Sequence, residues 1–521
     1  MGGLDSTQVA VLSTTQLGSL SPTQVGALST SAVLGLTASE WSALTVRQLG
    51  ALSSTQLGAL GVAQVGALSP AVLSSLSTTQ VRGLGSTAVA ALTTTQVNAL
   101  YTSQIAALGA TGAAGLTAVQ LTSLSVDRLA ALTSTALGAL ATSTLAGLSA
   151  QALQSLSAAQ LASLSSAGVA ALTPTTVASL TTTQLGAFTT SEISGFTSTQ
   201  VSALTSAQLS SLSGAQLAAL ATTGLPGLTA SQVATLANSQ IAALSAAQLG
   251  ALSGTAISGL SSTSLAALTT TQFAQLSASG ITGLSAEKIA ALTADQVRLL
   301  TSEELSGLTG TQVSAFTTGQ VSALGSTQLA ALSWSGLAGL RPSQAADLTL
   351  TQLAGIGPYQ IGALSTSAIQ SLSTAQVAAL DPQQMVGLVR MQLRALAPAQ
   401  VAALSTTQIS ALSGSQFAAM TSTEFQELSA DQLSALSAEQ VGALTGTQIG
   451  ALGATQLGRI APTQLTAITT TTIAAMPVST IELLPASLLA ALDGTQIGAF
   501  SQEQIDLLSP SQFAGLQQAL A

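Results

Sequence analysis

The sequence predicts an all-α solenoid, a superhelix of 64 short N-capped helices with one helix in each eight-residue repeat. Three observations predict this fold. An eight-residue unit repeats from Leu4 onward without insertion or deletion. Within the unit, hydroxyl and glutamine residues occupy the two positions of a capping box. Most prolines occupy one position of the unit, the position at which a helix begins.

The repeating unit reads L-[ST]-x-x-Q-[VLI]-x-[AG], as in residues 92–99 (LTTTQVNA), and we number its positions 1 to 8 from the leucine. Positions 1 and 6 are apolar throughout, which makes them the two core columns. Eight residues turn a continuous helix by about 800°, so an apolar stripe would slip by about 80° in each unit. In a strand, positions 1 and 6 would point to opposite faces. The columns therefore fit neither a continuous helix nor a simple strand.

Positions 2 and 5 identify the start of a helix. Position 2 is Ser or Thr in 45 of 64 units, and position 5 is Gln or Glu in 44. In a capping box the N-cap hydroxyl accepts the N3 amide proton, and the N3 side chain reaches back to the N-cap amide. The apolar residues at positions 1 and 6 form the accompanying hydrophobic staple. Glutamine at position 5 could also form ladders between coils, but the capping role already accounts for it.

Prolines and acidic residues give independent support. Fourteen of the eighteen acidic residues lie at positions 2, 4 or 5, where the helix dipole favours negative charge. Nine of the twelve prolines lie at position 3, the first helical residue, where a missing N–H costs nothing. The nine are Pro22, Pro70, Pro174, Pro342, Pro358, Pro382, Pro398, Pro462 and Pro510.

Such a short helix is unstable alone, because helix nucleation is unfavourable, so the units must stack as coils of a solenoid. We predict an N-terminal leader at residues 1–3, a continuous octad solenoid at 4–515 and a partial last repeat at 516–521. The alternative is a β-solenoid, since Ser, Thr and Gly are abundant and two octads would make a plausible coil. It explains neither the proline column nor the glutamine column. The number of octads in each coil stays open.

Composition excludes several classes of function. Charged residues make up only 5% of the chain, and nine Lys and Arg over 521 residues cannot form a surface that follows nucleic-acid phosphates. The net charge of −9 divides into −1 for residues 1–280 and −8 for residues 281–521. Cysteine and histidine are absent, which removes thiolate chemistry, disulfides and the usual zinc ligands. No stretch approaches the roughly 18 apolar residues of a membrane-spanning helix, and no secretory signal is visible. We therefore predict no catalytic, cofactor-binding or metal-binding residues, no cofactor, and no enzymatic activity.

Three groups of residues were considered as sites. The carboxylate pairs Glu303–Glu304, Glu424/Glu427 and Glu503/Asp506 are better explained as solvated charge favoured by helix dipoles than as calcium ligands. Two stretches depart most from the consensus: Arg341, Tyr359, Asp381, Arg390 and Arg394 in one, and residues 476–485 in the other. A binding patch in the first stretch, and a local kink with loss of the cap at Pro477 and Pro485 in the second, compete with simple drift of a tolerant repeat. Ser and Thr at positions 2 to 4 are expected to form hydroxyl rows along one edge.

The pattern resembles the octad-repeat tracts (LTTxQVAAL, LSTAQIAAL) of large bacterial surface or secreted proteins, and the resemblance covers essentially the whole chain. The unit is also similar to the start of a transcription activator-like effector repeat, as at residues 172–175 (LTPT). That family's longer repeat, with its base-reading loop and basic residues, does not occur here, so DNA binding is not implied.

The first resemblance implies an extracellular or cell-surface location. We predict a structural or adhesive module that acts as a spacer or a self-assembling fibre. Its partner would be the protein itself, through lateral or end-to-end contacts. The end-to-end contacts are expected because the octads begin and end without distinct polar caps. The alternative is a binding module whose Ser and Thr rows recognise polysaccharide or ice.

Overall fold

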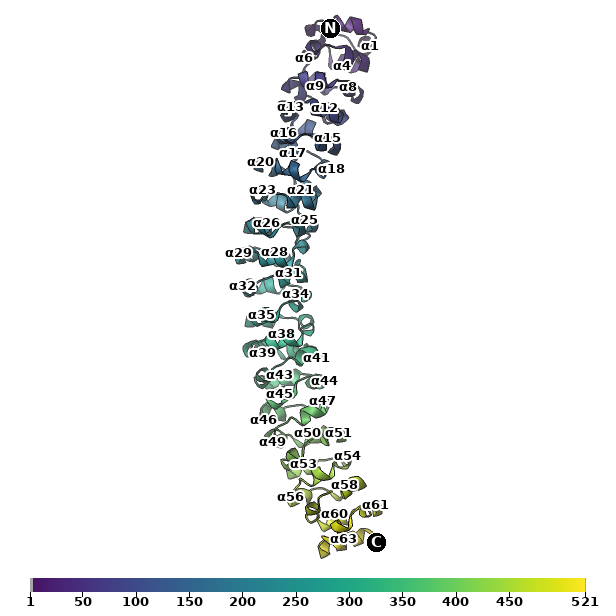
Figure 1. Cartoon of the computed structure of the whole chain (residues 1–521), viewed down its shortest axis with the longest axis vertical. Coiled ribbons are helices and arrows are strands. Elements are labelled where there is room, and N and C mark those ends of the chain that lie inside the picture. The colour runs from purple at the N-terminus through teal and green to yellow at the C-terminus, as the bar shows by residue number, and fades with distance from the viewer. Residues whose placement is uncertain (1–2, 521) are drawn as a thin grey trace. The chain divides into compact units, whose positions relative to one another are not determined.

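A computed structural model describes residues 3–520; Met1 and Gly2 of the predicted leader and Ala521 of the partial last repeat lie outside it. Every regular element of the described chain is a helix, and no strand occurs in residues 3–520. The prediction of an all-α solenoid is confirmed, and the β-solenoid alternative is wrong. Two compact units are distinguished, residues 1–280 and residues 281–521, and each is a stack of short helices (Figure 1).

The helices follow the octads. Every α-helix except α14 begins at position 3 of its octad, and every one except α63 is four to six residues long. In residues 1–280 the helices are α1 (Ser6–Val9), α2 (Thr14–Gly18), α3 (Pro22–Gly26), α4 (Thr30–Gly35), α5 (Ala38–Ala43), α6 (Val46–Gly50), α7 (Ser54–Gly58), α8 (Val62–Gly66), α9 (Pro70–Ser75), α10 (Thr78–Arg82), α11 (Ser86–Ala91), α12 (Thr94–Ala99), α13 (Thr102–Ala107), α14 (Gly109–Ala113), α15 (Ala118–Ser123), α16 (Val126–Ala130), α17 (Ser134–Gly138), α18 (Thr142–Leu145), α19 (Ala150–Gln154), α20 (Ala158–Leu161), α21 (Ser166–Ala171), α22 (Pro174–Ala178), α23 (Thr182–Gly186), α24 (Thr190–Ile193), α25 (Ser198–Ala203), α26 (Ser206–Ser211), α27 (Gly214–Ala218), the 3₁₀ helix η1 (Leu225–Gly227), α28 (Ala230–Ala234), α29 (Asn238–Ala242), α30 (Ala246–Gly250), α31 (Gly254–Ser258), α32 (Ser262–Ala266) and α33 (Thr270–Phe273).

Helix α34 (Ala278–Thr282) contains the boundary between the two units. The helices that follow it are α35 (Ala286–Ala290), α36 (Ala294–Leu299), α37 (Ser302–Ser306), α38 (Gly310–Ala315), α39 (Thr318–Ala323), α40 (Ser326–Ala330), α41 (Trp334–Leu337), α42 (Pro342–Ala346), α43 (Leu350–Gly355), α44 (Pro358–Ile361), α45 (Thr366–Gln370), α46 (Thr374–Ala378), α47 (Pro382–Gly387), α48 (Arg390–Leu393), α49 (Pro398–Ala402), α50 (Thr406–Ala411), α51 (Gly414–Phe417), α52 (Ser422–Gln426), α53 (Ala430–Ser434), α54 (Ala438–Gly442), α55 (Gly446–Ile449), α56 (Ala454–Leu457), α57 (Pro462–Leu465), α58 (Thr470–Ala474), α59 (Val478–Ile481), α60 (Ala486–Leu489), α61 (Gly494–Ile497), α62 (Gln502–Asp506) and α63 (Pro510–Leu520).

The capping box predicted for positions 2 and 5 is present in the structure. In α12 the hydroxyl of Thr93 accepts the amide proton of Gln96 at 3.2 Å, and the amide of Thr93 donates to Oε1 of Gln96 at 2.7 Å. Each of the nine prolines at position 3 is the first residue of its helix, as predicted. The N-cap residue of α12 is extended, with φ −71° and ψ 160°, so the chain turns sharply between one helix and the next.

The core consists of the two predicted columns. Leu92 at position 1 is 4% exposed and Val97 at position 6 is fully buried, and the same pair of positions is buried along both units. Removing a leucine and a valine from water stabilises each octad by about 1.5–3 kcal/mol per side chain, so every added coil contributes a similar increment. Because a helix of this length buries only two large side chains, its backbone also needs partners in the neighbouring coils.

The glutamines of position 5 supply those partners. Nε2 of Gln48 donates to the carbonyl oxygens of Leu17 at 3.1 Å and Leu20 at 2.8 Å, which lie 31 and 28 residues earlier. The same bonds recur along the chain, and helices three apart in number, such as α28 and α31, pack against one another (Figure 1). These separations of 28 and 31 residues fall between the length of three octads, 24 residues, and that of four octads, 32 residues. Each coil therefore takes between three and four octads. The capping role predicted for this glutamine is only part of its function, because each side-chain amide caps its own helix and also bonds the preceding coil.

Small residues at positions 7 and 8 allow the coils to approach closely. A Cβ atom added to Gly83, at position 8, would lie 2.1 Å from the carbonyl oxygen of Ser54 in the preceding coil. A Cβ atom added to Gly58, at position 7, would lie 2.6 Å from the carbonyl oxygen of Gly83 in the following coil. Both distances are shorter than real carbon–oxygen contacts, so a side chain at either place would force the two coils to shift apart.

Two octads of the first unit lose the regular helix start, and both lack the capping residues. In residues 108–115, Gly109 stands at the N-cap position with φ +61°, and α14 begins at this glycine. In residues 220–227, Gly224 replaces the glutamine, and Pro226 at position 7 has no N–H to bond back to position 3. The segment therefore forms the tighter η1, in which the amide of Gly227 donates to the carbonyl of Gly224 at 3.1 Å.

The second unit departs from the pattern in two ways. Pro477 and Pro485 are the N-cap residues of α59 and α60, and neither forms a side-chain cap bond, so the predicted loss of the cap is confirmed. A helix nevertheless begins at the next residue in both octads. Helix α63 continues from the last complete octad into the partial repeat as one helix of 11 residues, whereas the sequence predicts one short helix confined to each octad. Leu516 is followed by Gln-Gln-Ala rather than by a Ser or Thr cap, so nothing interrupts the helix.

Candidate functional site

In two of the three carboxylate pairs one carboxylate is buried and the other is exposed, whereas Glu503 and Asp506 are both exposed. Glu304 is buried at position 5, where it accepts the amide proton of Thr301 at 2.6 Å, whereas Glu303 beside it is exposed. Glu424 is buried in the same way and Glu427 is exposed. In residues 3–520 no three acidic side chains come close enough together to hold a metal ion.

Four glutamates, Glu40, Glu192, Glu304 and Glu424, replace glutamine at position 5, and all four are buried. Each carboxylate accepts the N-cap amide proton, but an ionised carboxylate has no proton to donate to the carbonyls of the preceding coil. Burial raises the pKa of Glu424 above its usual value, while hydrogen bonds from Thr421 and the nearby charge of Arg394 act in the opposite direction. Replacement of Gln by Glu thus weakens the ladder locally.

The predicted patch between Arg341 and Arg394 divides in the structure. Arg341 donates from Nη2 to the carbonyl of Phe316 at 2.9 Å, which makes it part of the contact between coils. Asp381 is the N-cap of α47 and accepts the amide proton of Gln383 at 2.8 Å. Tyr359 is 88% exposed. Only Arg390 and Arg394 line a common hollow.

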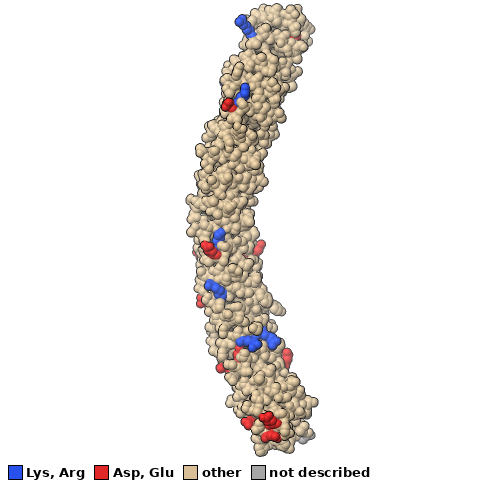
Figure 2. All heavy atoms as spheres, viewed as in Figure 1, with Lys and Arg blue, Asp and Glu red and all other residues tan. Residues whose placement is uncertain are grey.

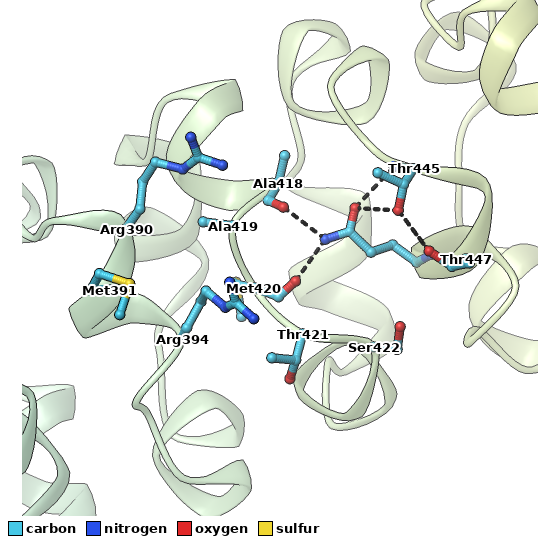
Figure 3. A pocket seen from close by; sticks show the side chains of 11 residues that line it. Arg390, Met391, Arg394, Ala418, Ala419, Met420, Thr421, Ser422, Thr445 and Thr447 are labelled. Atoms are coloured by element: carbon cyan, nitrogen blue, oxygen red, sulfur yellow. Dashed lines mark hydrogen bonds between the residues drawn. The ribbon is translucent and has the colours of Figure 1, made fainter.

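This hollow, the arginine hollow, lies on the second unit between α48, α52 and α55 and has a volume of about 640 Å³. Figure 3 shows the two arginine side chains projecting from α48 toward the segment that carries Ala418 and Met420. On the far side, Nε2 of Gln448 donates to the carbonyls of Ala418 at 3.0 Å and Met420 at 2.7 Å. The residues that line the arginine hollow are Arg390, Met391, Arg394, Ala418, Ala419, Met420, Thr421, Ser422, Thr445, Thr447 and Gln448.

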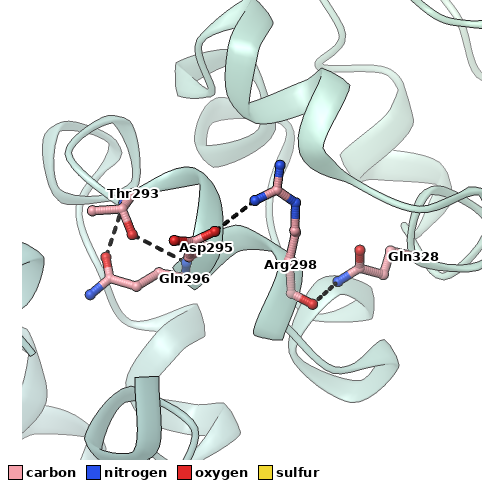
Figure 4. A network of polar contacts seen from close by, with 5 residues as sticks. All are labelled: Thr293, Asp295, Gln296, Arg298 and Gln328. Carbon is pink, nitrogen blue, oxygen red and sulfur yellow. Dashed lines mark hydrogen bonds and ion pairs between the residues drawn. The ribbon is translucent and has the colours of Figure 1, made fainter. Parts of the chain in front are cut away.

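The arginines of the hollow differ from Arg298 in their partners. Nη1 of Arg298 lies 2.7 Å from Oδ1 of Asp295 on the same helix, and the carbonyl of Arg298 accepts from Nε2 of Gln328 (Figure 4). Neither Arg390 nor Arg394 has a carboxylate within 4.0 Å among the described residues. The two guanidinium groups are exposed and available to an outside anion.

A second hollow, on the first unit, is lined by hydroxyl groups instead of charges. It has a volume of about 830 Å³ and lies over η1, between α25, α28 and α31. Several of its hydroxyls are already engaged within their own turns: Oγ1 of Thr229 lies 3.1 Å from Oγ of Ser231, and Oγ of Ser253 lies 3.1 Å from Oγ1 of Thr255. Some hydroxyl groups of the predicted rows are thus already hydrogen-bonded at the helix caps.

Residues 129–280 carry no exposed charge. The single ionisable residue of this stretch is Glu192, which is 5% exposed and accepts the amide and hydroxyl protons of Thr189 at 2.7 and 2.5 Å. On the face in view, Figure 2 shows the corresponding part of the first unit without coloured atoms. Among the described helices none is long and apolar enough to cross a membrane.

Comparison with known proteins shows that the octads are similar to a family of repeats. Five segments of the chain match the ALTTAQ repeat: residues 42–70, 71–102, 177–214, 353–389 and 391–422. The name of that family corresponds to the octad read from position 8, as in residues 91–96 (ALTTTQ). No curated protein matches the chain. The matched segments support a repeat protein with a structural character, and they lie in both units.

The carbonyls that receive the glutamine donors were not visible in the sequence. Every octad offers the same carbonyls at positions 1, 6 and 7, so the glutamine column alone does not say which coil receives the bond. The arginine hollow was missed for the same reason. Arg390 and Arg394 were recognised as unusual, but Thr445 and Thr447, more than 50 residues later, follow the consensus and give no signal.

Proposed function

We propose that this protein is a structural repeat module that acts as a spacer and assembles into fibres, as part of a bacterial cell-surface or secreted protein. The observation that carries the proposal is the uncharged surface of residues 129–280. Like charges keep protein surfaces apart, and none are exposed here to oppose contact between two copies. Exposed Ser, Thr and Ala side chains remain, which can pack and exchange hydrogen bonds side by side.

The ladder between coils supports the role of a spacer. Most octads repeat the same three contacts: a cap within their own helix, a bond to the preceding coil, and two buried apolar side chains. In such a stack the stability is approximately a sum over neighbouring units, so the number of coils can vary without a change in local structure. The surface or secreted location rests on the resemblance to bacterial octad tracts. The absence of histidine and cysteine supports a role without catalysis.

The experiment is sedimentation velocity and electron microscopy of the purified chain over a range of concentrations. A variant with Ala159→Lys, Thr183→Lys and Ala207→Lys adds three exposed charges at position 4, away from the cores. The matched control carries Gln at the same three positions. We expect fibres from the wild type and the control. The lysine variant should stay dispersed at low salt and recover fibres at high salt, where charges are screened. Monodisperse wild-type particles at all concentrations would contradict the assembly and leave only the spacer.

A second candidate is a binding module whose Ser and Thr rows recognise polysaccharide or ice. The hydroxyl-lined hollow over η1 favours polysaccharide. Ice is disfavoured, because several hydroxyls of these rows are already hydrogen-bonded within their own turns. Glycan-array binding without fibres would support this candidate over the first.

A further inference from the structure

We propose that the arginine hollow binds the carboxylate of an acidic saccharide, with Arg390 and Arg394 as the ligands of the anion. This rests on the second candidate function, the binding of polysaccharide, and names the chemistry of the ligand. The two arginines are four residues apart, at the start of α48 and at its C-cap, so both side chains leave the same face of the helix. In Figure 3 the side chain of Arg390 ends level with Ala418 and that of Arg394 ends beside Met420.

The chemistry of the two groups favours a carboxylate. A guanidinium group is always protonated and presents its donors as a planar fork that matches the two oxygens of a carboxylate. Neither arginine has a carboxylate within 4.0 Å in the described chain, whereas Arg298 already has Asp295. Glu424, whose carboxylate feels the charge of Arg394, is buried and bonded to the amide of Thr421, and it does not line the hollow.

The rest of the lining fits the hydroxyl-rich body of a sugar. Four hydroxyl side chains, Thr421, Ser422, Thr445 and Thr447, lie around the arginines. Oγ1 of Thr445 bonds Oε1 of Gln448 at 2.9 Å and Oγ1 of Thr447 at 3.0 Å, while the hydroxyl of Ser422 has no partner within the described residues. Polar groups of this kind can donate and accept, as sugar hydroxyls require.

The volume of the arginine hollow and the apolar side chain of Met391 also fit an acidic saccharide. The volume of about 640 Å³ lies in the range of small-molecule sites. Met391 is 65% exposed and supplies a flexible apolar surface against which the C–H face of a sugar ring can pack. A carboxylate side chain from a second protein copy would pair with the arginines, but it carries no sugar hydroxyls to pair with the free hydroxyl of Ser422. An acidic saccharide matches both the two arginines and the hydroxyl side chains of the lining.

The test uses the full chain and a trimer of galacturonic acid as the probe, with the corresponding neutral galactose trimer as the comparison, by isothermal titration calorimetry at low salt. The variant is Arg390→Gln with Arg394→Gln, and the matched control is Arg298→Gln, which removes a paired arginine of the same unit. We expect the wild type and Arg298→Gln to bind the acidic trimer equally. The double variant should bind at least about tenfold more weakly, because charge-assisted forks are lost. The neutral trimer should not bind.

Equal binding of the two trimers, or equal affinity of the wild type and the double variant, would overturn the proposal. A loss of affinity as large in Arg298→Gln would show a general effect of charge and would also overturn it. If the double substitution abolishes fibre formation and no saccharide binds, the occupant is a second copy and the saccharide is wrong. Binding of the acidic trimer by a chain that forms no fibres would contradict the assembly and leave this inference standing.

Discussion

The ladder makes a quantitative prediction at Gln440, which is 1% exposed. Its Oε1 accepts the amide proton of Ser437 at 2.8 Å, and its Nε2 donates to the carbonyls of Ile409 at 2.7 Å and Leu412 at 2.8 Å. A net value of about 1 kcal/mol for each bond gives a destabilisation of about 3 kcal/mol for Gln440→Leu. Ser437→Ala removes only the hydroxyl that accepts the amide proton of Gln440, and should cost about 1 kcal/mol.

The assay is native-state hydrogen exchange with peptides that cover residues 406–413 and 437–442, because a long repeat array does not unfold as one two-state unit. Gln440→Leu should lower protection in both peptides, whereas Ser437→Ala should act on the second peptide alone. The control is Gln184→Leu, since the bond from Gln184 to Gln154 is exposed to water, which can replace it. The reasoning is refuted if Gln440→Leu leaves residues 406–413 unchanged, or if its cost equals that of Ser437→Ala.

Other predictions follow from the same structure. Thr93→Ala, which removes one cap, should cost about 1 kcal/mol, and Leu92→Ala, which empties a core position, about 2–5 kcal/mol, both measured as local exchange protection. Gly83→Ala should destabilise its two coils by about 1–3 kcal/mol, because the new methyl group would overlap a carbonyl oxygen. In Gly66→Ala the new methyl group meets nothing within 4 Å, so this variant should be neutral or slightly stabilising. A thermal unfolding scan would compare the two variants. The raised pKa of Glu424 means that its protonated form favours the fold at low pH, and that this stability is lost as pH rises through the folded-state pKa. Glu424→Gln should remove that loss and add about 1 kcal/mol at neutral pH, seen as higher exchange protection of α52. We expect no metal to remain after chelation and dialysis, which elemental analysis would check.

The candidate site shows where prediction from sequence reached its limit. Arg341, Tyr359, Asp381, Arg390 and Arg394 were grouped because they break the consensus within one stretch of chain. The structure assigns the first arginine to a contact between coils and Asp381 to a helix cap, and only Arg390 and Arg394 share a hollow. Closeness in sequence was a poor guide here, because neighbouring octads of a coil face different directions, and contacts join residues about 25 to 31 apart.

Some irregular elements could be recognised in advance and others could not. The octad at residues 220–227 lacks both capping residues and carries Pro226 in the helix, and these local features account for η1. The octads at Pro477 and Pro485 also lack caps, yet both form regular helices, because their apolar positions are still buried between neighbouring coils. Packing therefore outweighed the lost cap there, in agreement with the small energy of a single cap.

The sequence by itself determined everything that acts within one octad: the start of each helix at position 3, the cap at position 2, the first-turn prolines and the two buried columns. The helix start, the cap and the first-turn prolines depend on hydrogen bonds and backbone geometry within one octad, and the two columns are apolar in every octad, whichever coil covers them. Only the tertiary structure decided which coil receives each glutamine, how many octads form a coil, which glycines lie too close to the next coil for a side chain, and which side chains meet in the arginine hollow. The physical reason is the period itself. A chain that repeats every eight residues looks the same after a shift of three octads or four, so the register between coils is set by how the small side chains and carbonyls pack.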